Sequence, residues 1–245
     1  MNDENVKKSV VSSKTFKIAI LIFIIVALFF YFKIFFSTGI RYDDTFLKKD
    51  VKSSESHYSG KNKYGRLHIT VKKPTDHPEI TEVIYQLPNN ILQEYAVEFG
   101  KNAVLGQEIK IRDKNGNMIV EGIYRKESYF LYDTKGQPFM DDYIQVIING
   151  ESPYNSDYKV SLKNVADLAC FATETIRGRY YFLIFAVIFF AITVIDVKFP
   201  LFFFTLSHFI DVKNPEPSDF YLSMQRTLWF VYPIIGIVFM IIAII

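Results

Sequence analysis

The chain contains little of what usually supports catalysis or a disulfide framework. Cys170 is the only cysteine among 245 residues, so no intrachain disulfide can form and no N-terminal lipid-attachment cysteine is present. The apolar residues around Cys170 recur with helical spacing, which predicts that its thiol lies on a buried helix face. Exported bacterial domains often lack disulfides, so cysteine usage does not identify the compartment.

Metal-binding and catalytic motifs are also lacking. The four histidines are too far apart in sequence to suggest a zinc pair. Asp113, Asn115 and Asn117 begin like a calcium loop, but Met118 stands where that loop requires glycine, so a plain hairpin turn is favoured. Phosphate-binding, nucleotide-binding, serine-nucleophile and HExxH motifs are missing. We therefore assign no catalytic residue, metal or cofactor, and favour a non-enzymatic protein.

Charge of one sign is not in excess either. The chain has 28 Lys+Arg and 26 Asp+Glu, a formal net charge of +2. Binding to a nucleic-acid backbone rests on a basic surface, and the region 37–178 has no basic excess. The adjacent carboxylates Asp43-Asp44 and Asp141-Asp142 are interpreted as solvated surface, since neighbours on a strand point to opposite faces. Nucleic acid is therefore not an expected partner.

Apolar residues, in contrast, make up 50% of the chain and are concentrated in three runs. A helix needs about 20 apolar residues to cross the hydrocarbon core of a bilayer. Three transmembrane helices are predicted, over 18–36, 179–197 and 227–245. Lys33, Asp196 and Lys198 lie near helix ends rather than in mid-span, so an ion or proton pathway is not indicated.

The first run follows a basic N-terminal segment, residues 1–17. It is longer than the roughly 7–15 apolar residues of a cleaved signal peptide, which favours an uncleaved signal anchor. Lysines before the first inserted helix favour a cytoplasmic N-terminus. The expected location is the cell membrane, with a multi-pass chain whose central domain is extracytoplasmic.

The central region predicts a linker followed by a β domain. Residues 37–63 are polar and serine-containing and are interpreted as a linker, and 64–178 as an extramembrane β domain. Alternating apolar residues over 64–149 predict about seven mostly antiparallel strands, the last over 143–149. Two turns, 113–116 and 133–136, share an Asp-x-x-Gly pattern typical of a type I turn followed by a left-handed glycine.

A switch to helical spacing predicts an amphipathic helix over 161–176, with Ser161 as its N-cap. This helix leads toward the second span. Two arrangements are open: one continuous helix over 161–197, or two helices with a hinge at Gly178.

Residues 198–226, between the last two spans, predict an interfacial helix and a proline-rich turn. Pro200 suits the start of a short apolar helix over 201–210, too short to span the bilayer. Asn-Pro-Glu-Pro at 214–217 disfavours helix, because a proline biases its predecessor toward extended geometry. Ser218 is then the expected N-cap of the last helix, and Asp219 complements its dipole.

The region of about 180–245 resembles a family of small bacterial membrane-hairpin domains of unknown function. The likeness rests on Phe-Pro at 199–200 and on an N-x-E-P-S-x-x-Y turn motif. It implies a bacterial integral membrane protein and brings no reaction with it. Glu216 either shapes this turn or binds a basic side chain of a partner, so the candidate interaction motif comprises Asn214, Glu216, Pro217, Ser218 and Tyr221.

The sequence as a whole predicts an α+β membrane protein with an N-terminal anchor, a β domain and a C-terminal helical hairpin. The expected function is that of an accessory, sensing or interaction subunit. Its expected partners are the lipid bilayer and another membrane protein, and its oligomeric state is left open. The alternative is a membrane-surface enzyme acting on lipid or cell-envelope material.

Overall fold

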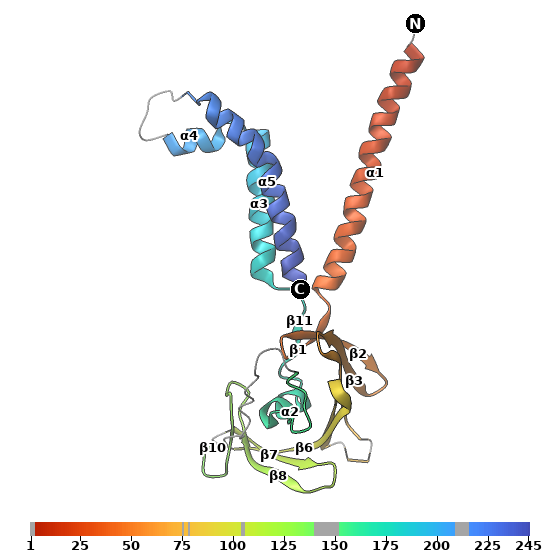
Figure 1. The fold of residues 1–245 in the computed structure, drawn as a ribbon, viewed down its shortest axis with the longest axis vertical. Helices are drawn as coiled ribbons and strands as arrows, with labels where there is room; N and C mark the ends of the chain where they lie inside the picture. Colours follow the sequence, from red (N-terminus) through yellow and green to blue (C-terminus); the bar gives the residue numbers. More distant parts are fainter. Residues whose placement is uncertain (1–2, 75, 78, 104–105, 140–151, 209–215) are drawn as a thin grey trace. The chain divides into compact units, whose positions relative to one another are not determined.

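The computed structural model describes residues 3–74, 76–77, 79–103, 106–139, 152–208 and 216–245 (Figure 1). The chain divides into two compact units, one formed by 1–36 with 177–245 and the other by 37–176. The first unit is helical, and the second holds the sheet. The predicted α+β class is confirmed.

Three helices of the first unit are long and apolar enough to cross a membrane. They are α1 (Asp3–Phe35), α3 (Tyr180–Lys198) and α5 (Asp219–Ile244), and a short helix, α4 (Phe202–His208), follows α3. The candidate span within α1 is Lys14–Phe35. The three predicted spans therefore all coincide with helices.

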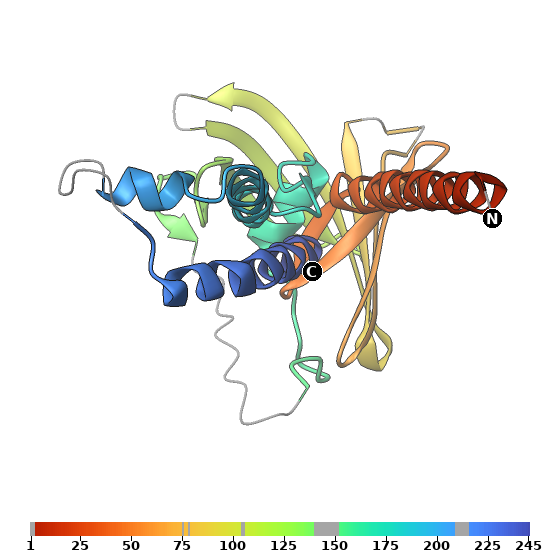
Figure 2. The same ribbon diagram turned by 90° about the horizontal axis from the view of Figure 1, so that it is seen from above.

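Helices α3 and α5 form an antiparallel hairpin (Figures 1 and 2). The N–H of Arg179, before α3, donates to the carbonyl of Ala243 at the end of α5. In the middle of the hairpin a Cβ added to Gly236 would lie 2.9 Å from the Phe190 ring, so the absence of a side chain permits this close approach. Gly236 is thus a helix-packing position within the hairpin.

The second unit is a single antiparallel meander of eleven strands among the described residues. The strand order is β10-β9-β8-β7-β6-β5-β4-β3-β2-β1-β11, so nearly every strand pairs with its neighbour in the chain. The strands are β1 (Thr38–Tyr42), β2 (Thr45–Lys52), β3 (Glu55–Asn62), β4 (Gly65–Lys72), β5 (Ile80–Leu87), β6 (Ile91–Ala103), β7 (Gly106–Asp113), β8 (Met118–Tyr124), β9 (Leu131–Tyr132), β10 (Pro138–Phe139) and β11 (Thr175–Ile176).

The sheet curves around one helix, α2 (Leu162–Ala169), which lies in its hollow (Figure 1). Alternate residues of the strands point inward and are buried, such as Leu67, Ile69 and Val71 of β4. The apolar face of α2 meets them through Val165 and Leu168. This shared core holds the β domain together, since burying apolar surface is the main stabilising contribution in such a fold.

The prediction that residues 37–63 are a linker is wrong, because they form strands β1, β2 and β3. Few of their inward positions are apolar: Leu47 is fully buried in β2 and Tyr58 in β3. Their outward positions carry lysine, aspartate and serine, so the stretch resembles a linker in composition. The strands exist because β4 offers β3 a partner over eight residue pairs.

The helix predicted over 161–176 is shorter, because α2 ends at Ala169. Phe171 adopts a left-handed conformation (φ 57°), and the N–H groups of Phe171 and Ala172 bond the carbonyls of Leu168 and Asp167. This is a Schellman ending, usually built on glycine, and a phenylalanine there gives no sequence signal. Residues 175–176 then form β11, which excludes one continuous helix into α3.

The twin hairpin turns are confirmed. Asp113 Oδ1 accepts from the N–H groups of Asn115 and Asn117, both at 2.9 Å. Asp133 Oδ1 accepts equivalently from Lys135 and Gln137, both at 2.8 Å. Gly116 and Gly136 have φ of +83° and +80°. The strand predicted over 143–149 lies outside the described residues.

Candidate functional site

A polar cavity of about 680 Å³ opens in the β domain. Its walls come from the β1–β2 turn, the β3–β4 turn and the segment that leads into α2. We call it the tyrosine pocket, and the residues that define it are Asp43, Asn62, Tyr64, Tyr154, Tyr158 and Asn164.

A hydrogen-bond network centred on Asp43 lines the pocket. The hydroxyls of Tyr154 and Tyr158 donate to Asp43 Oδ2 at 2.7 and 3.3 Å. Asn62 Nδ2 donates to the Tyr154 hydroxyl at 3.1 Å, and the hydroxyls of Tyr42 and Tyr158 lie 2.6 Å apart. Within the described part of the chain, the second carboxylate oxygen of Asp43 accepts no hydrogen bond. That oxygen is available to a bound molecule.

Asp43 reaches the pocket because it lies in the two-residue hairpin turn between β1 and β2. Tyr42 pairs with Thr45, and the two residues between them, Asp43 and Asp44, both have positive φ (45° and 57°). This is a type I′ hairpin turn, whose twist matches that of the flanking strands. Asp43 and Asp44 are both exposed, as predicted for solvated surface, but they lie in a turn and not on a strand, and Asp43 also belongs to a hydrogen-bond network.

The two tyrosines stand on a segment that the sheet holds in place. Asn89 Nδ2 donates to the Tyr154 carbonyl at 2.6 Å, and Gln93 Nε2 donates to the Tyr158 carbonyl at 2.5 Å. Gln93 Oε1 in turn accepts from the N–H of Val160 at 3.1 Å. Side chains of the β5–β6 connection and of β6 thus take over backbone hydrogen bonds that this irregular segment does not make internally.

The pocket tyrosines are held in their protonated form. Burial raises the pKa of Tyr154 well above its usual value, and the hydrogen bond to Asp43 adds to the shift. Burial likewise raises the pKa of Tyr158 and of Tyr42. At neutral pH these hydroxyls are therefore protonated and can both donate and accept hydrogen bonds.

Charged side chains of both signs surround the network. Arg41, Lys63 and Lys159 line the pocket together with Asp43 and Asp44. The Lys63 ammonium lies 4.7 Å from the centroid of the Tyr64 ring. The described lining residues thus bring three cations and two carboxylates to the pocket.

A second polar cluster joins α3 and α5. Asp196 on α3 is buried; its Oδ1 accepts from Gln225 Nε2 and its Oδ2 from Trp229 Nε1, both at 2.7 Å. Gln225 Nε2 also donates to the carbonyl of Pro200 at 2.5 Å. Both carboxylate oxygens are used inside the hairpin, so we interpret this cluster as a latch between the helices.

The predicted interaction motif lies at the start of α5. Ser218 Oγ accepts from the N–H of Tyr221 at 3.2 Å, so Ser218 is the N-cap as predicted. The Tyr221 ring lies 4.9 Å from that of Phe204, which attaches α4 to α5. Glu216 is exposed and Pro217 half-buried. Asn214 lies outside the described residues, and so does the part of the predicted helix beyond His208.

Residues 185–243 match the Family of unknown function (DUF6199). No curated protein and no solved structure matches the chain. The DUF6199 match contains most of α3, all of α4 and nearly all of α5, so the resemblance seen in the C-terminal sequence is supported at the level of a family without an assigned function. Asp196, Gln225 and Trp229 lie within the match, whereas the tyrosine pocket lies outside it.

Some polar contacts in the structure could not be predicted from the spacing of residues in the sequence. The sequence places Asp196 near a helix end but does not predict its burial. The burial depends on the hydrogen-bond donors Gln225 and Trp229 of α5. His57 and His68 are distant in sequence, yet their rings stack 5.4 Å apart on neighbouring strands. The described residues contain no group of three or more metal-ligating side chains.

The prediction for Cys170 is wrong, because the residue is exposed. It is the C-cap of α2, one position after the last helical residue, so it leaves the buried face. Its Sγ lies 3.2 Å from the hydroxyl of Tyr124.

Proposed function

We propose that this chain is a membrane-anchored binding subunit whose β domain takes up a polyhydroxylated ligand of the saccharide class in the tyrosine pocket. The observation that carries this proposal is the Asp43 carboxylate, held by the Tyr154 and Tyr158 hydroxyls with its other oxygen available. A carboxylate fixed by two donors is a preorganised acceptor for ligand hydroxyl groups.

The pocket offers what a sugar ring needs. Asn62 and Asn164 offer amide N–H groups as donors, because their oxygens already accept from the Tyr64 and Gly65 N–H groups and from the Tyr85 hydroxyl, and Asp43 accepts. The Tyr64 and Tyr154 rings meet edge to face at 5.9 Å, and such rings bring apolar surface next to polar groups. A ligand with alternating C–H faces and hydroxyl edges uses both kinds of surface, while the near balance of charge among the described lining residues gives no preference for a strongly charged molecule.

Binding is favoured over catalysis at this pocket. Hydrolysis of a glycosidic bond uses two carboxylates on opposite sides of the bond. The two carboxylates that the described residues bring to the pocket, Asp43 and Asp44, are neighbours in one turn. The raised pKa values of Tyr154 and Tyr158 keep their hydroxyls protonated, which supports a role in hydrogen bonding.

The binding test uses the full chain in nanodiscs, titrated with N-acetylhexosamine oligosaccharides and followed by calorimetry. Wild type should bind at least one of these saccharides. Asp43→Ala and Tyr154→Phe should weaken that binding by about 10-fold or more, the effect of losing a hydrogen bond that involves a charged group.

A matched control is Tyr58→Phe. Tyr58 is also buried, and its hydroxyl donates to the carboxylate of Glu174 at 2.5 Å, outside the pocket. This variant should bind saccharide like wild type. Absence of saccharide binding by wild type, or equal binding by Asp43→Ala, would overturn the proposal. Appearance of new reducing ends during the titration would instead indicate the alternative, a membrane-surface enzyme.

We further propose that the chain lies in the cell membrane of a bacterium with its N-terminus in the cytoplasm and its β domain outside. The basic segment before the first apolar run supports this orientation. A binding subunit acts on an effector, which we propose is another membrane protein. A photo-reactive amino acid at the exposed position Glu216 should give one crosslinked product of defined mass in native membranes. Only uncrosslinked chain would argue against this partner.

A further inference from the structure

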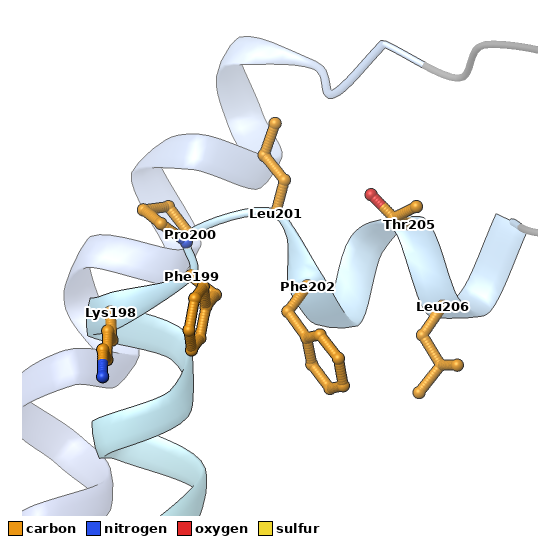
Figure 3. A pocket seen from close by; sticks show the side chains of 7 residues that line it. All are labelled: Lys198, Phe199, Pro200, Leu201, Phe202, Thr205 and Leu206. Carbon is orange, nitrogen blue, oxygen red and sulfur yellow. The ribbon is translucent and has the colours of Figure 1, made fainter.

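The bend between α3 and α4 contains an apolar groove of about 590 Å³ (Figure 3). It is lined by residues 198–202 with Thr205 and Leu206, and we call it the elbow groove. In Figure 3 the side chains of Lys198, Phe199, Phe202 and Leu206 extend to the same side of the chain, whereas Leu201 and Thr205 extend to the other. The groove therefore has an apolar wall with one cation at its edge.

The described residues of the helical unit leave this wall exposed. Phe199, Phe202 and Leu206 are 54%, 47% and 63% exposed. They follow directly on α3, a helix long and apolar enough to span a membrane, and α4 is too short to span on its own. Side chains at this position meet the boundary between hydrocarbon and headgroups, where an acyl chain can cover them.

Lys198 supplies a positive charge that can attract an anionic headgroup. It is the last residue of α3, and it forms no ion pair with another described residue. Its ammonium lies 5.5 Å from the Phe199 ring centroid, so cation and apolar wall are adjacent. The nearest carboxylate in sequence, Asp196, is directed into the hairpin, where Gln225 and Trp229 occupy its oxygens.

We propose that the elbow groove binds one anionic phospholipid. Its phosphate contacts the Lys198 ammonium, and one acyl chain lies along Phe199, Phe202 and Leu206. The inference is independent of the saccharide proposal, because the groove and the tyrosine pocket belong to different units of the chain. Lysine near a membrane surface contributes attraction to anionic lipids, which a zwitterionic lipid of the same acyl composition does not gain.

The test is native mass spectrometry of the full chain released from nanodiscs with equal amounts of phosphatidylglycerol and phosphatidylcholine of identical acyl chains. Wild type should retain one phosphatidylglycerol in preference to phosphatidylcholine by about fivefold. Lys198→Gln should abolish this preference while keeping some lipid. Phe202→Ala combined with Leu206→Ala should reduce retention of both lipids.

Lys33→Gln is the matched control, because Lys33 is also a lysine in the last turn of a predicted span. It should leave the preference unchanged. The emission of Trp229, the only tryptophan, checks that the hairpin remains folded in each variant. Equal retention of the two lipids by wild type, an unchanged preference in Lys198→Gln, or a co-purified protein that excludes lipid from the groove would overturn the proposal.

Discussion

The Tyr154 hydroxyl donates a 2.7 Å hydrogen bond to Asp43 Oδ2, joining residues that are 111 positions apart in the chain. Asp43 projects from the first hairpin turn of the β domain, and Tyr154 stands on the segment that precedes α2. The contact fixes the opening of the tyrosine pocket. It also shows why the pocket exists only when the first and last parts of the domain fold together.

The buried tyrosines predict loss of stability in alkaline solution. Burial raises the pKa of Tyr42, Tyr85 and Tyr158 above the usual value near 10. Because the folded state favours the protonated form, their contribution is complete below pH ~10 and is lost as the pH rises further. The free energy of unfolding should fall by about 1.4 kcal/mol per pH unit for each such tyrosine. Tyrosinate absorbance and far-UV circular dichroism should change together, and early ionisation without unfolding would contradict this.

Gly39 is predicted to be intolerant of any side chain. A Cβ there would lie 2.0 Å from the carbonyl oxygen of Leu47 on the paired strand β2. Gly39→Ala should therefore destabilise the β domain by about 2–4 kcal/mol, because the strands must separate. The control Gly116→Ala meets no atom within 4 Å and only strains a positive φ, which costs about 1 kcal/mol. Thermal unfolding of the two variants should rank them in this order, and equal melting temperatures would refute the close approach.

The latch predicts a specific effect on the helical hairpin. Asp196→Ala leaves the donors of Gln225 and Trp229 without their acceptor, at a cost of about 1.5–3 kcal/mol. The melting temperature in detergent should fall, and the emission of Trp229 should shift. Asp219→Asn removes an exposed charge in the first turn of α5, so it should lower the melting temperature less, through the helix dipole alone, and leave the Trp229 emission unchanged. Equal changes in melting temperature and Trp229 emission in the two variants would contradict the interpretation of this cluster as a latch.

Orientation is predicted through the single cysteine. Cys170 is exposed in the β domain, so a membrane-impermeant maleimide should label it in intact cells if that domain is outside. Cys170→Ser should abolish labelling, and Asn115→Cys in that background should restore it, because Asn115 is exposed at a hairpin tip. Labelling that requires cell lysis would place the β domain in the cytoplasm.

Features that depend on short stretches of chain were predictable from the sequence. The three spans follow from apolar length, and all three appear as helices. The turns at Asp113 and Asp133 follow from side chains that bond their own turn, and the cap at Ser218 from one that bonds the next turn. In each case the interacting groups are no more than a few residues apart, so a short stretch of sequence is enough to predict the structure.

Only the tertiary structure decided the rest. Strands β2 and β3 have too few apolar residues to be recognised alone, and pairing with their neighbours stabilises them. The hydroxyl of Tyr154 is oriented by its hydrogen bond to Asp43. The carboxylate of Asp196 is satisfied by Gln225, which is 29 residues away in the chain. Such contacts depend on the path of the chain between the partners, which residue spacing does not specify. The sequence by itself determined three helices long and apolar enough to cross a membrane, together with a β domain, and folding determined where the buried polar groups meet.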